Sequence, residues 1–228
     1  MIQETPEADL FKQQLRDSLI RETRNSRAIK VSKGGSVYNI GDTDDTIYFI
    51  DTGQIKLLML SPEGKECMLA IYTAGDIFGE LCLSGLPARL DQAVAMEDTA
   101  IKKVMRDSFF RRLGDDSLFK GFVQYLAVRL ADQQQLIANL VTVDSEHRLG
   151  ETLLQLARKM GKKDPRSIRI DLQITHEELS TMVGTTRPRI SLFMQRFKNL
   201  GLIETSAGHH MIVKEQKLTD YLRTLSGS

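Results

Sequence analysis

The feature that most constrains the fold is an apolar heptad-like repeat between residues 117 and 143. Gly121 is the only glycine in this stretch and proline is absent, so one long helix can run through it. The repeated positions follow alternating steps of three and four residues: Phe119, Phe122, Leu126, Arg129, Gln133, Leu136, Leu140 and Val143. Such spacing is typical of the seam between two coiled helices. The stretch therefore predicts a dimerisation helix, through which two copies of the chain form a homodimer.

Two polar residues, Arg129 and Gln133, interrupt this seam, and Gln134 adjoins them. Polar residues at seam positions can fix the alignment of two helices at some cost in stability. The same polar section could instead contact a small effector, and both interpretations stay open. The apolar positions are the predicted dimer interface: Phe119, Phe122, Leu126, Leu136, Leu140 and Val143.

The pattern before this helix is different. Residues 8–20 have apolar side chains near helical spacing and predict a short helix. From residue 27 to about residue 106, apolar residues alternate, and turn signals such as Gly34-Gly35 and Ala74-Gly75-Asp76 recur every few residues. Short strands with frequent turns indicate a β-barrel or jelly roll.

After the long helix, the sequence predicts a helix-turn-helix. Thr175 and Glu178 have the spacing of a capping box, so a helix should begin there. Gly184 suits a tight turn, and a second helix starts near Arg187-Pro188, where proline is tolerated in the first turn. In this motif the second helix enters the DNA major groove. Residues 202–204 and 210–213 flank residues 206–209 and predict a β-hairpin wing.

Arginine can donate two hydrogen bonds to guanine, which makes the start of the second helix the predicted base-reading end. Arg196 and Lys198 lie further along, where phosphate contacts are expected. The full set of predicted DNA-binding residues is Thr175, Thr186, Arg187, Pro188, Arg189, Ser191, Arg196 and Lys198.

The charge distribution agrees with this division. Residues 1–144 hold 17 Lys and Arg against 21 Asp and Glu, a net charge of −4, whereas residues 145–228 hold 14 against 9, a net charge of +5. An acidic front and a basic back suggest that only the back meets a polyanion. No apolar run is long enough to span a membrane, and residues 1–6 lack the layout of a signal peptide. We therefore expect a cytoplasmic protein in which Cys67 and Cys82 are buried thiols.

In the order of its motifs, nearly the whole chain resembles the Crp–Fnr family of transcription regulators. The matching segments are residues 41–57 in the β-roll, residues 75–81 at the start of the phosphate-binding cassette, and residues 139–140 and 148–154 around the end of the dimer helix. The resemblance implies an α+β fold with a cyclic-nucleotide-binding-type β-roll (a jelly roll), a dimerisation helix and a winged helix-turn-helix. We expect them at residues 1–114, 115–143 and 144–228.

The resemblance also implies an effector site, onto which Gly79 and Glu80 carry over directly, and the adjoining Leu81 is included in the predicted site. The family's phosphate-gripping arginine and serine become Asp91 and Gln92, Arg89 lies two residues early, and the adenine-contacting pair becomes Gln133 and Gln134. An aspartate repels a phosphate, which puts cyclic AMP in doubt. Arg89 and Asp91 could together address guanine, so cyclic di-GMP is an alternative, and a solvated loop salt bridge between them is another. Arg129, beside the two glutamines, completes the predicted site.

DNA recognition departs from the family as well. Members that read the common half-site carry a glutamate after the first arginine and another arginine four residues further on, where this chain has Pro188 and Leu192. We therefore expect a different half-site that still contains guanine, within a pseudo-palindromic double-stranded DNA site, and RNA polymerase as a further partner.

Two other classes of protein were weighed. A cupin-like enzyme would need metal-binding histidines inside the barrel, but His147, His176, His209 and His210 lie outside it, so we expect neither catalysis nor a metal. An iron–sulfur sensor would need four cysteines, and there are two. The remaining alternative is a constitutive DNA-binding dimer whose barrel serves only as a scaffold.

Overall fold

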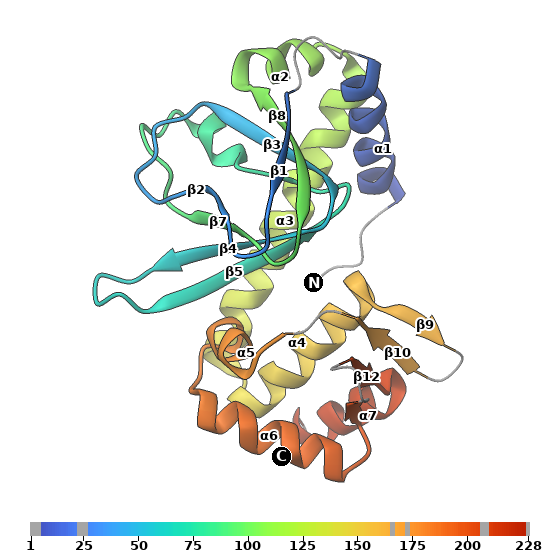
Figure 1. Cartoon of the computed structure of the whole chain (residues 1–228). Helices are drawn as coiled ribbons and strands as arrows, with labels where there is room; N and C mark the ends of the chain where they lie inside the picture. The colour runs from blue at the N-terminus through green and yellow to red at the C-terminus, as the bar shows by residue number, and fades with distance from the viewer. Residues whose placement is uncertain (1–5, 22–26, 165–166, 172–173, 206–209, 227–228) are drawn as a thin grey trace. The chain divides into compact units, whose positions relative to one another are not determined.

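A computed structural model describes residues 6–21, 27–164, 167–171, 174–205 and 210–226 (Figure 1). The chain forms two compact units, Ile2–Gln133 and Gln134–Ser228. In the described part of the chain, every helix is too short or too polar to cross a lipid bilayer.

The first unit is built on eight strands arranged in two four-stranded antiparallel sheets. The strands are β1 (Arg27–Val31), β2 (Ser36–Tyr38), β3 (Thr46–Thr52), β4 (Gln54–Leu60), β5 (Glu66–Thr73), β6 (Ile77–Phe78), β7 (Gln92–Ala95) and β8 (Thr99–Met105). One sheet has the order β1-β8-β3-β6 and the other β2-β7-β4-β5. Alternating side chains from both sheets fill the interior, which confirms the predicted β-roll.

Four aromatic rings lie within that interior. Phe78 stacks on Tyr48 with ring centroids 5.0 Å apart, and the ring centroids of Tyr38 and Tyr72 lie 6.1 and 6.5 Å from that of Phe78. All four side chains are buried. The interior of the β-roll is therefore a packed aromatic layer, whose polar hydroxyl groups need partners of their own.

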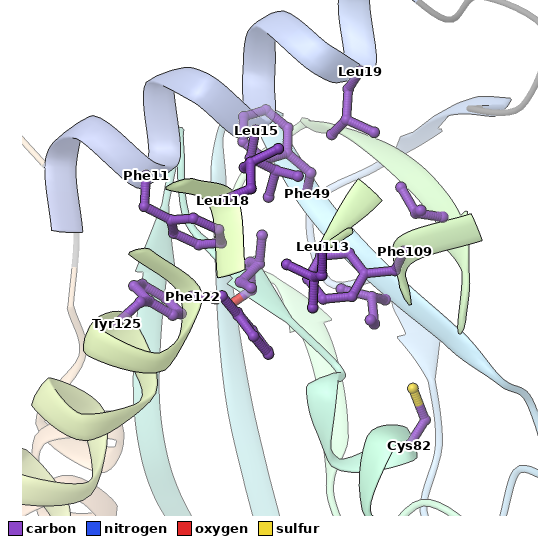
Figure 2. Packing of buried hydrophobic residues seen from close by; sticks show 13 residues of the cluster. Phe11, Leu15, Leu19, Phe49, Cys82, Phe109, Leu113, Leu118, Phe122 and Tyr125 are labelled. Atoms are coloured by element: carbon purple, nitrogen blue, oxygen red, sulfur yellow. Dashed lines mark hydrogen bonds between the residues drawn. The ribbon is translucent and has the colours of Figure 1, made fainter. Parts of the chain in front are cut away.

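Helices cover one side of the β-roll. They are α1 (Pro6–Arg21), the 3₁₀ helix η1 (Glu80–Ser84), α2 (Arg106–Arg112) and the first part of α3 (Asp116–Thr142). Figure 2 shows Phe11 of α1 directed at Phe122 and Tyr125 of α3, and the Phe11 and Phe122 ring centroids lie 5.8 Å apart. Gly121 permits this contact, because a Cβ there would lie 2.9 Å from the Cβ of Phe11.

This packing corrects one part of the predicted seam. Phe122 was expected at the dimer interface, but it is 5% exposed and packs against Phe11 and Phe109 inside its own unit. Leu126 is half-buried against the same cluster. The heptad spacing correctly predicts a helix, but periodicity alone does not show whether an apolar face meets a second chain or a covering helix.

The second unit is a winged helix-turn-helix. Its elements are α4 (Ser145–Met160), β9 (Lys162–Asp164), β10 (Ser167–Ile170), α5 (His176–Val183), α6 (Arg187–Asn199), β11 (Ile203–Thr205), β12 (Met211–Val213) and α7 (Glu215–Ser226). The sheet has the order β11-β12-β10-β9, and β11 pairs with β12 antiparallel as the wing prediction requires. The predicted tip of the wing, residues 206–209, lies outside the described residues. The sequence did not predict α2 or α7.

The two thiols differ. Cys82 of η1 is buried as expected, whereas Cys67 is exposed, so that part of the prediction is wrong. Cys67 lies near the start of β5, where the β4–β5 hairpin extends beyond the packed interior, and apolar neighbours in the sequence did not reveal this.

Candidate functional site

The β-roll and helix α3 are joined by an ion pair at the predicted effector site. Glu80 follows Gly79, which adopts a left-handed backbone conformation at the start of η1. The Oε1 atom of Glu80 lies 2.8 Å from a terminal guanidinium nitrogen of Arg129, and the side chains are only 12% and 17% exposed. The structure thus brings together three of the residues that the sequence assigned to this site.

Tyr72 of β5 completes the surroundings of Arg129. The guanidinium donates a hydrogen bond to the Tyr72 hydroxyl, and its carbon lies 4.6 Å from the centre of the Tyr72 ring. Burial alone would lower the pKa of Arg129, but Tyr72 and Glu80 outweigh it and raise that pKa. Arg129 therefore faces its own β-roll and stays charged, so it does not serve as a register residue between two helices.

Arg89 is buried within the first unit at 4% exposure. Its guanidinium donates to the Asp44 carboxylate and to the backbone carbonyls of Thr46 and Gly79, and lies 4.4 Å from the centre of the Tyr38 ring. Burial favours a raised pKa for Asp44, but the bond from Arg89 holds that pKa below its ordinary value. The structure therefore contradicts the solvated salt bridge between Arg89 and Asp91, because the partner of Arg89 is Asp44.

Asp91, two residues further on, is also 4% exposed. Burial raises the pKa of its carboxyl and, with the nearby negative charge of Glu80, outweighs the Tyr38 hydrogen bond and the charge of Arg89, which lower it. The pKa of Asp44 is thus lowered by Arg89 and that of Asp91 is raised by burial, so the two carboxyls are shifted in opposite directions.

The other predicted effector residues are less closely involved. Leu81 is exposed, and the Gln92 amide donates to Asn39 Oδ1 at 3.0 Å. Gln133 and Gln134 are exposed on α3. Across the described ranges, neither glutamine shares a hydrogen bond with Glu80, Arg89 or Asp91.

Two buried polar atoms of this cluster are left over, because Asp91 interacts with the Tyr38 hydroxyl. Glu80 Oε2 and Arg89 Nε have no hydrogen-bond partner among the residues that the structure describes. Buried polar groups are almost always hydrogen-bonded, so each such atom calls for an explanation. A polar ligand that supplies both donors and acceptors would satisfy them, and this fits the chemistry of a nucleotide.

Sequence reasoning missed Asp44, Tyr38 and Tyr72. Asp44 belongs to the acidic run at residues 42–45, which precedes β3 and looks like an ordinary solvated turn. The two tyrosines occupy strand positions where any large apolar residue would fit. The signal available was the presence of tyrosine at positions expected to be buried, because a buried tyrosine needs a partner for its hydroxyl.

The outward side of α3 carries apolar residues one position later than the predicted seam. Val123, Leu130, Ile137 and Val141 are all exposed, and with the exposed Ala127 and Gln134 they follow steps of four and three. Of the predicted seam, Phe119, Leu136 and Leu140 are exposed and Val143 is half-buried. The described helix therefore offers a coiled-coil stripe shifted by one residue.

In the second unit, the predicted capping box is confirmed. Thr175 Oγ1 accepts from the Glu178 backbone N–H at 3.1 Å, and Glu178 Oε2 accepts from the Thr175 N–H at 3.0 Å. Gly184 ends α5 with φ +68°, a left-handed conformation that glycine adopts at no steric cost, and Thr186 is the N-cap of α6. These features fix the angle between α5 and α6.

The predicted DNA-reading residues lie on or beside α6. Arg187, Pro188 and Arg189 are exposed in its first turn. Ser191 is exposed, and its hydroxyl lies 2.9 Å from His176 Nδ1 of α5. Burial and the charges of Lys198 and Arg187 lower the pKa of His176, so this contact involves a neutral imidazole at pH 7.

Arg196 is held by a partner of its own. One terminal nitrogen lies 3.0 Å from Glu146 Oε2 of α4, while Glu146 Oε1 accepts from the Tyr221 hydroxyl at 2.6 Å. Burial and this bond raise the pKa of Tyr221 to about 12. The Arg196 side chain remains 59% exposed, so its outer face is available to an anion.

Together, a β-roll with a polar ligand-type cluster and a winged helix-turn-helix with exposed arginines define an effector-gated DNA-binding regulator. Residues 28–116 match the cyclic nucleotide-binding domain, and residues 147–221 match the Crp-like helix-turn-helix domain. The chain belongs to the Crp–Fnr family of transcription regulators.

Similar proteins support this assignment. The chain is 25% identical over 197 residues to the CRP-like cAMP-activated global transcriptional regulator of Mycobacterium tuberculosis, covering 86% of this chain and 88% of that one. It is 27% identical over 180 residues to the Cyclic AMP receptor protein of Thermus thermophilus, covering 77% and 79%. A solved CooA mutant from Carboxydothermus hydrogenoformans superposes with a TM-score of 0.73 at 28% identity, covering 90% and 94%.

A fourth similarity shows the fold alone. The c-di-GMP responsive regulator CLP of Xanthomonas campestris superposes with a TM-score of 0.71 at 18% identity, covering 87% of this chain and 98% of that one. The same architecture thus occurs in regulators whose names specify different cyclic nucleotides.

Proposed function

We propose that this chain is a cytoplasmic, homodimeric transcription regulator without catalytic activity, in which an effector bound at Glu80, Arg89, Asp91 and Arg129 controls DNA binding. The three-part division at residues 1–114, 115–143 and 144–228 belongs to this proposal. The observation that carries it is the Glu80–Arg129 ion pair, because it ties the effector cluster to the helix expected to form the dimer. A ligand that competes for either partner changes how α3 is held.

The gating mechanism is a shift between two populations. Effector binding favours one alignment of the paired α3 helices, which sets the two α6 helices about 34 Å apart, one turn of DNA. Each α6 then enters the major groove of one half of a pseudo-palindromic site, with Arg187 directed at guanine. RNA polymerase is the further partner that such a regulator would recruit or block.

The effector proposal is a cyclic nucleotide, and the polar cluster limits how it binds. Arg89 and Arg129 each have a carboxylate partner within the chain, so a phosphate at either guanidinium would share it with Asp44 or Glu80 or displace that carboxylate. The carboxyl of Asp91 can accept hydrogen bonds from both the N1–H and the 2-amino group of guanine, whereas adenine presents a single N–H donor group on that edge. This favours cyclic di-GMP over cyclic AMP.

The internal pairing also supports a second candidate, a constitutive regulator whose β-roll is a scaffold. Arg89 and Arg129 need no external anion to balance their charge. Gly79, Leu81, Gln92, Gln133 and Gln134 would then have no effector role.

Fluorescence anisotropy with labelled DNA separates the two candidates. A DNA duplex that the protein binds is first selected from a random library and labelled. The full chain is then titrated into it in the presence of cyclic AMP, cyclic di-GMP, cyclic GMP or buffer alone. Gated binding predicts at least a tenfold change in affinity with one nucleotide and none with the others. Equal affinity under all four conditions would support the constitutive regulator, and no preference for any duplex would refute both.

A further inference from the structure

Helix α6 presents a leucine at the middle of its exposed side. Leu192 is 66% exposed, whereas the residues that hold α6 to the core (Ile190, Phe193, Met194 and Phe197) are at most 8% exposed. Single exposed apolar residues are common on protein surfaces, so exposure alone means little. What matters here is the place of Leu192 on the helix.

Leu192 points away from the core. Successive helix residues are separated by about 100° around the axis, which puts Leu192 roughly 30° from the point opposite the four buried residues. Pro188, Gln195 and Asn199 lie on the same line at steps of four, three and four, and all are exposed. All four side chains on this central line are uncharged. The Gln195 amide donates to Asn199 Oδ1 at 2.9 Å.

Cationic side chains lie on both sides of the central line. Arg187 and Lys198 lie on one side of it, and Arg189 and Arg196 on the other. The Arg189 guanidinium lies 5.8 Å from the Phe193 ring centre and Arg196 pairs with Glu146, which keeps both off the line. A helix in the major groove has base edges in front of it. Side chains of its first turn, such as Arg187, reach base edges from beside the central line, whereas flanking side chains further along reach phosphates. The line through Leu192 therefore faces the bases.

Among base edges in the major groove, the apolar group is the 5-methyl of thymine. We propose that Leu192 contacts a thymine methyl group and thereby specifies a T·A pair in each half-site. This inference rests on the proposed DNA binding. It assigns a specificity role to a position where the sequence departs from the family's arginine.

Replacing thymine by uracil tests the contact, because it removes only the methyl group. A preferred duplex is selected from a random library with the full chain, and each thymine is replaced in turn by deoxyuridine. The chain should bind about fourfold more weakly when the critical thymine is replaced in one half-site, the effect of one buried methyl group. Leu192→Ala should bind the thymine and uracil duplexes equally.

Leu200→Ala is the matched control, since Leu200 is also an exposed leucine but lies at the C-terminal cap of α6. It should retain the fourfold thymine preference. Leu192 is exposed, so its loss should leave the fold intact, which circular dichroism verifies. The methyl contact would be refuted, while DNA binding stood, if the wild-type protein bound every uracil-containing duplex with the same affinity as the thymine duplex. It would also be refuted if Leu192→Ala still bound the thymine duplex more tightly. Failure to select any duplex would refute both.

Discussion

Arginine has opposite surroundings in the two units. In the β-roll, Arg89 and Arg129 are enclosed by carboxylates, carbonyls and tyrosine rings. On α6, Arg187 and Arg189 project from the first turn of an exposed helix. The difference teaches that an arginine in a sensor domain can be part of the fold before it is part of a binding site, whereas an arginine on a recognition helix is available from the start.

The largest effect that tests this contrast is loss of Arg89. Arg89→Gln should lower the free energy of unfolding of the first unit by about 4 kcal/mol, because Asp44 and two carbonyls lose a buried charged partner. Urea denaturation followed by tyrosine fluorescence reports mainly on this unit, which holds four of the five tyrosines.

Arg187→Gln is the control for that measurement. It removes an exposed side chain, so the free energy of unfolding should change by less than about 0.5 kcal/mol. Equal destabilisation by the two substitutions would end the distinction between structural and available arginines.

The next effect concerns α3, which has one apolar side packed within the first unit, against α1 and α2, and another apolar side that is exposed. Ile137→Glu places a charge on the outward stripe and should weaken dimerisation more than a hundredfold, about 3 kcal/mol. Sedimentation equilibrium measures the change. Leu136→Glu, at the position of the originally predicted seam, is the matched comparison, and a larger effect at Leu136 would restore that original register.

A smaller effect is expected at the base-reading end of α6. Arg187→Ala should reduce specific DNA binding by about 2 kcal/mol and relax preference at one base pair, with the fold unchanged. Competition binding against duplexes mutated at each position shows this. Lys198→Ala should weaken all duplexes alike and reduce the salt dependence by about one unit. An unaltered base preference in Arg187→Ala would contradict the direct contact.

The smallest effect sharpens the comparison within the β-roll itself. The pKa of Asp91 is raised by burial, so the folded chain keeps this proton as the pH rises above 3.8, where the unfolded chain has lost it. The contribution of Asp91 to stability therefore declines with rising pH across that window. Asp91→Asn should gain on the order of 1 kcal/mol relative to wild type at pH 7, and little at pH 3.5.

Asp44→Asn should show the opposite sign. The folded-state pKa of Asp44 is lowered by Arg89, so its contribution is present above pH 3.8 and is lost as the pH falls through the folded pKa. The substitution should destabilise the chain at pH 7 and matter least in acid. Thermal unfolding at several pH values compares both variants, and curves of the same sign would contradict the opposed shifts.

The helix-turn-helix could be predicted from the sequence because its determinants are local. Thr175 and Glu178 are three residues apart, and Gly184 alone provides the turn. The β-roll cluster could not be derived in this way. Arg89 and Asp44 are 45 residues apart, and Arg129 and Tyr72 are 57 apart, so their pairing depends on strand register and helix packing that no local pattern encodes.

The heptad on α3 shows an intermediate case. The spacing identified a long helix correctly, but Phe122 belongs to an inward face and Ile137 to an outward one. When a helix is apolar on two sides, more than one set of its positions fits the three-and-four spacing of a coiled-coil seam. Only the position of α1, which covers Phe122, decides between them (Figure 2).

Gly121 couples the N-terminal helix to the evolution of α3. Glycine within a helix costs about 1 kcal/mol relative to alanine, and here it leaves room for Phe11. A shortened chain without α1 should reverse that preference, because alanine at position 121 would no longer meet Phe11 and would strengthen the helix. Relatives that lose the N-terminal helix should therefore be free to replace this glycine, whereas those that keep a bulky aromatic residue there should not.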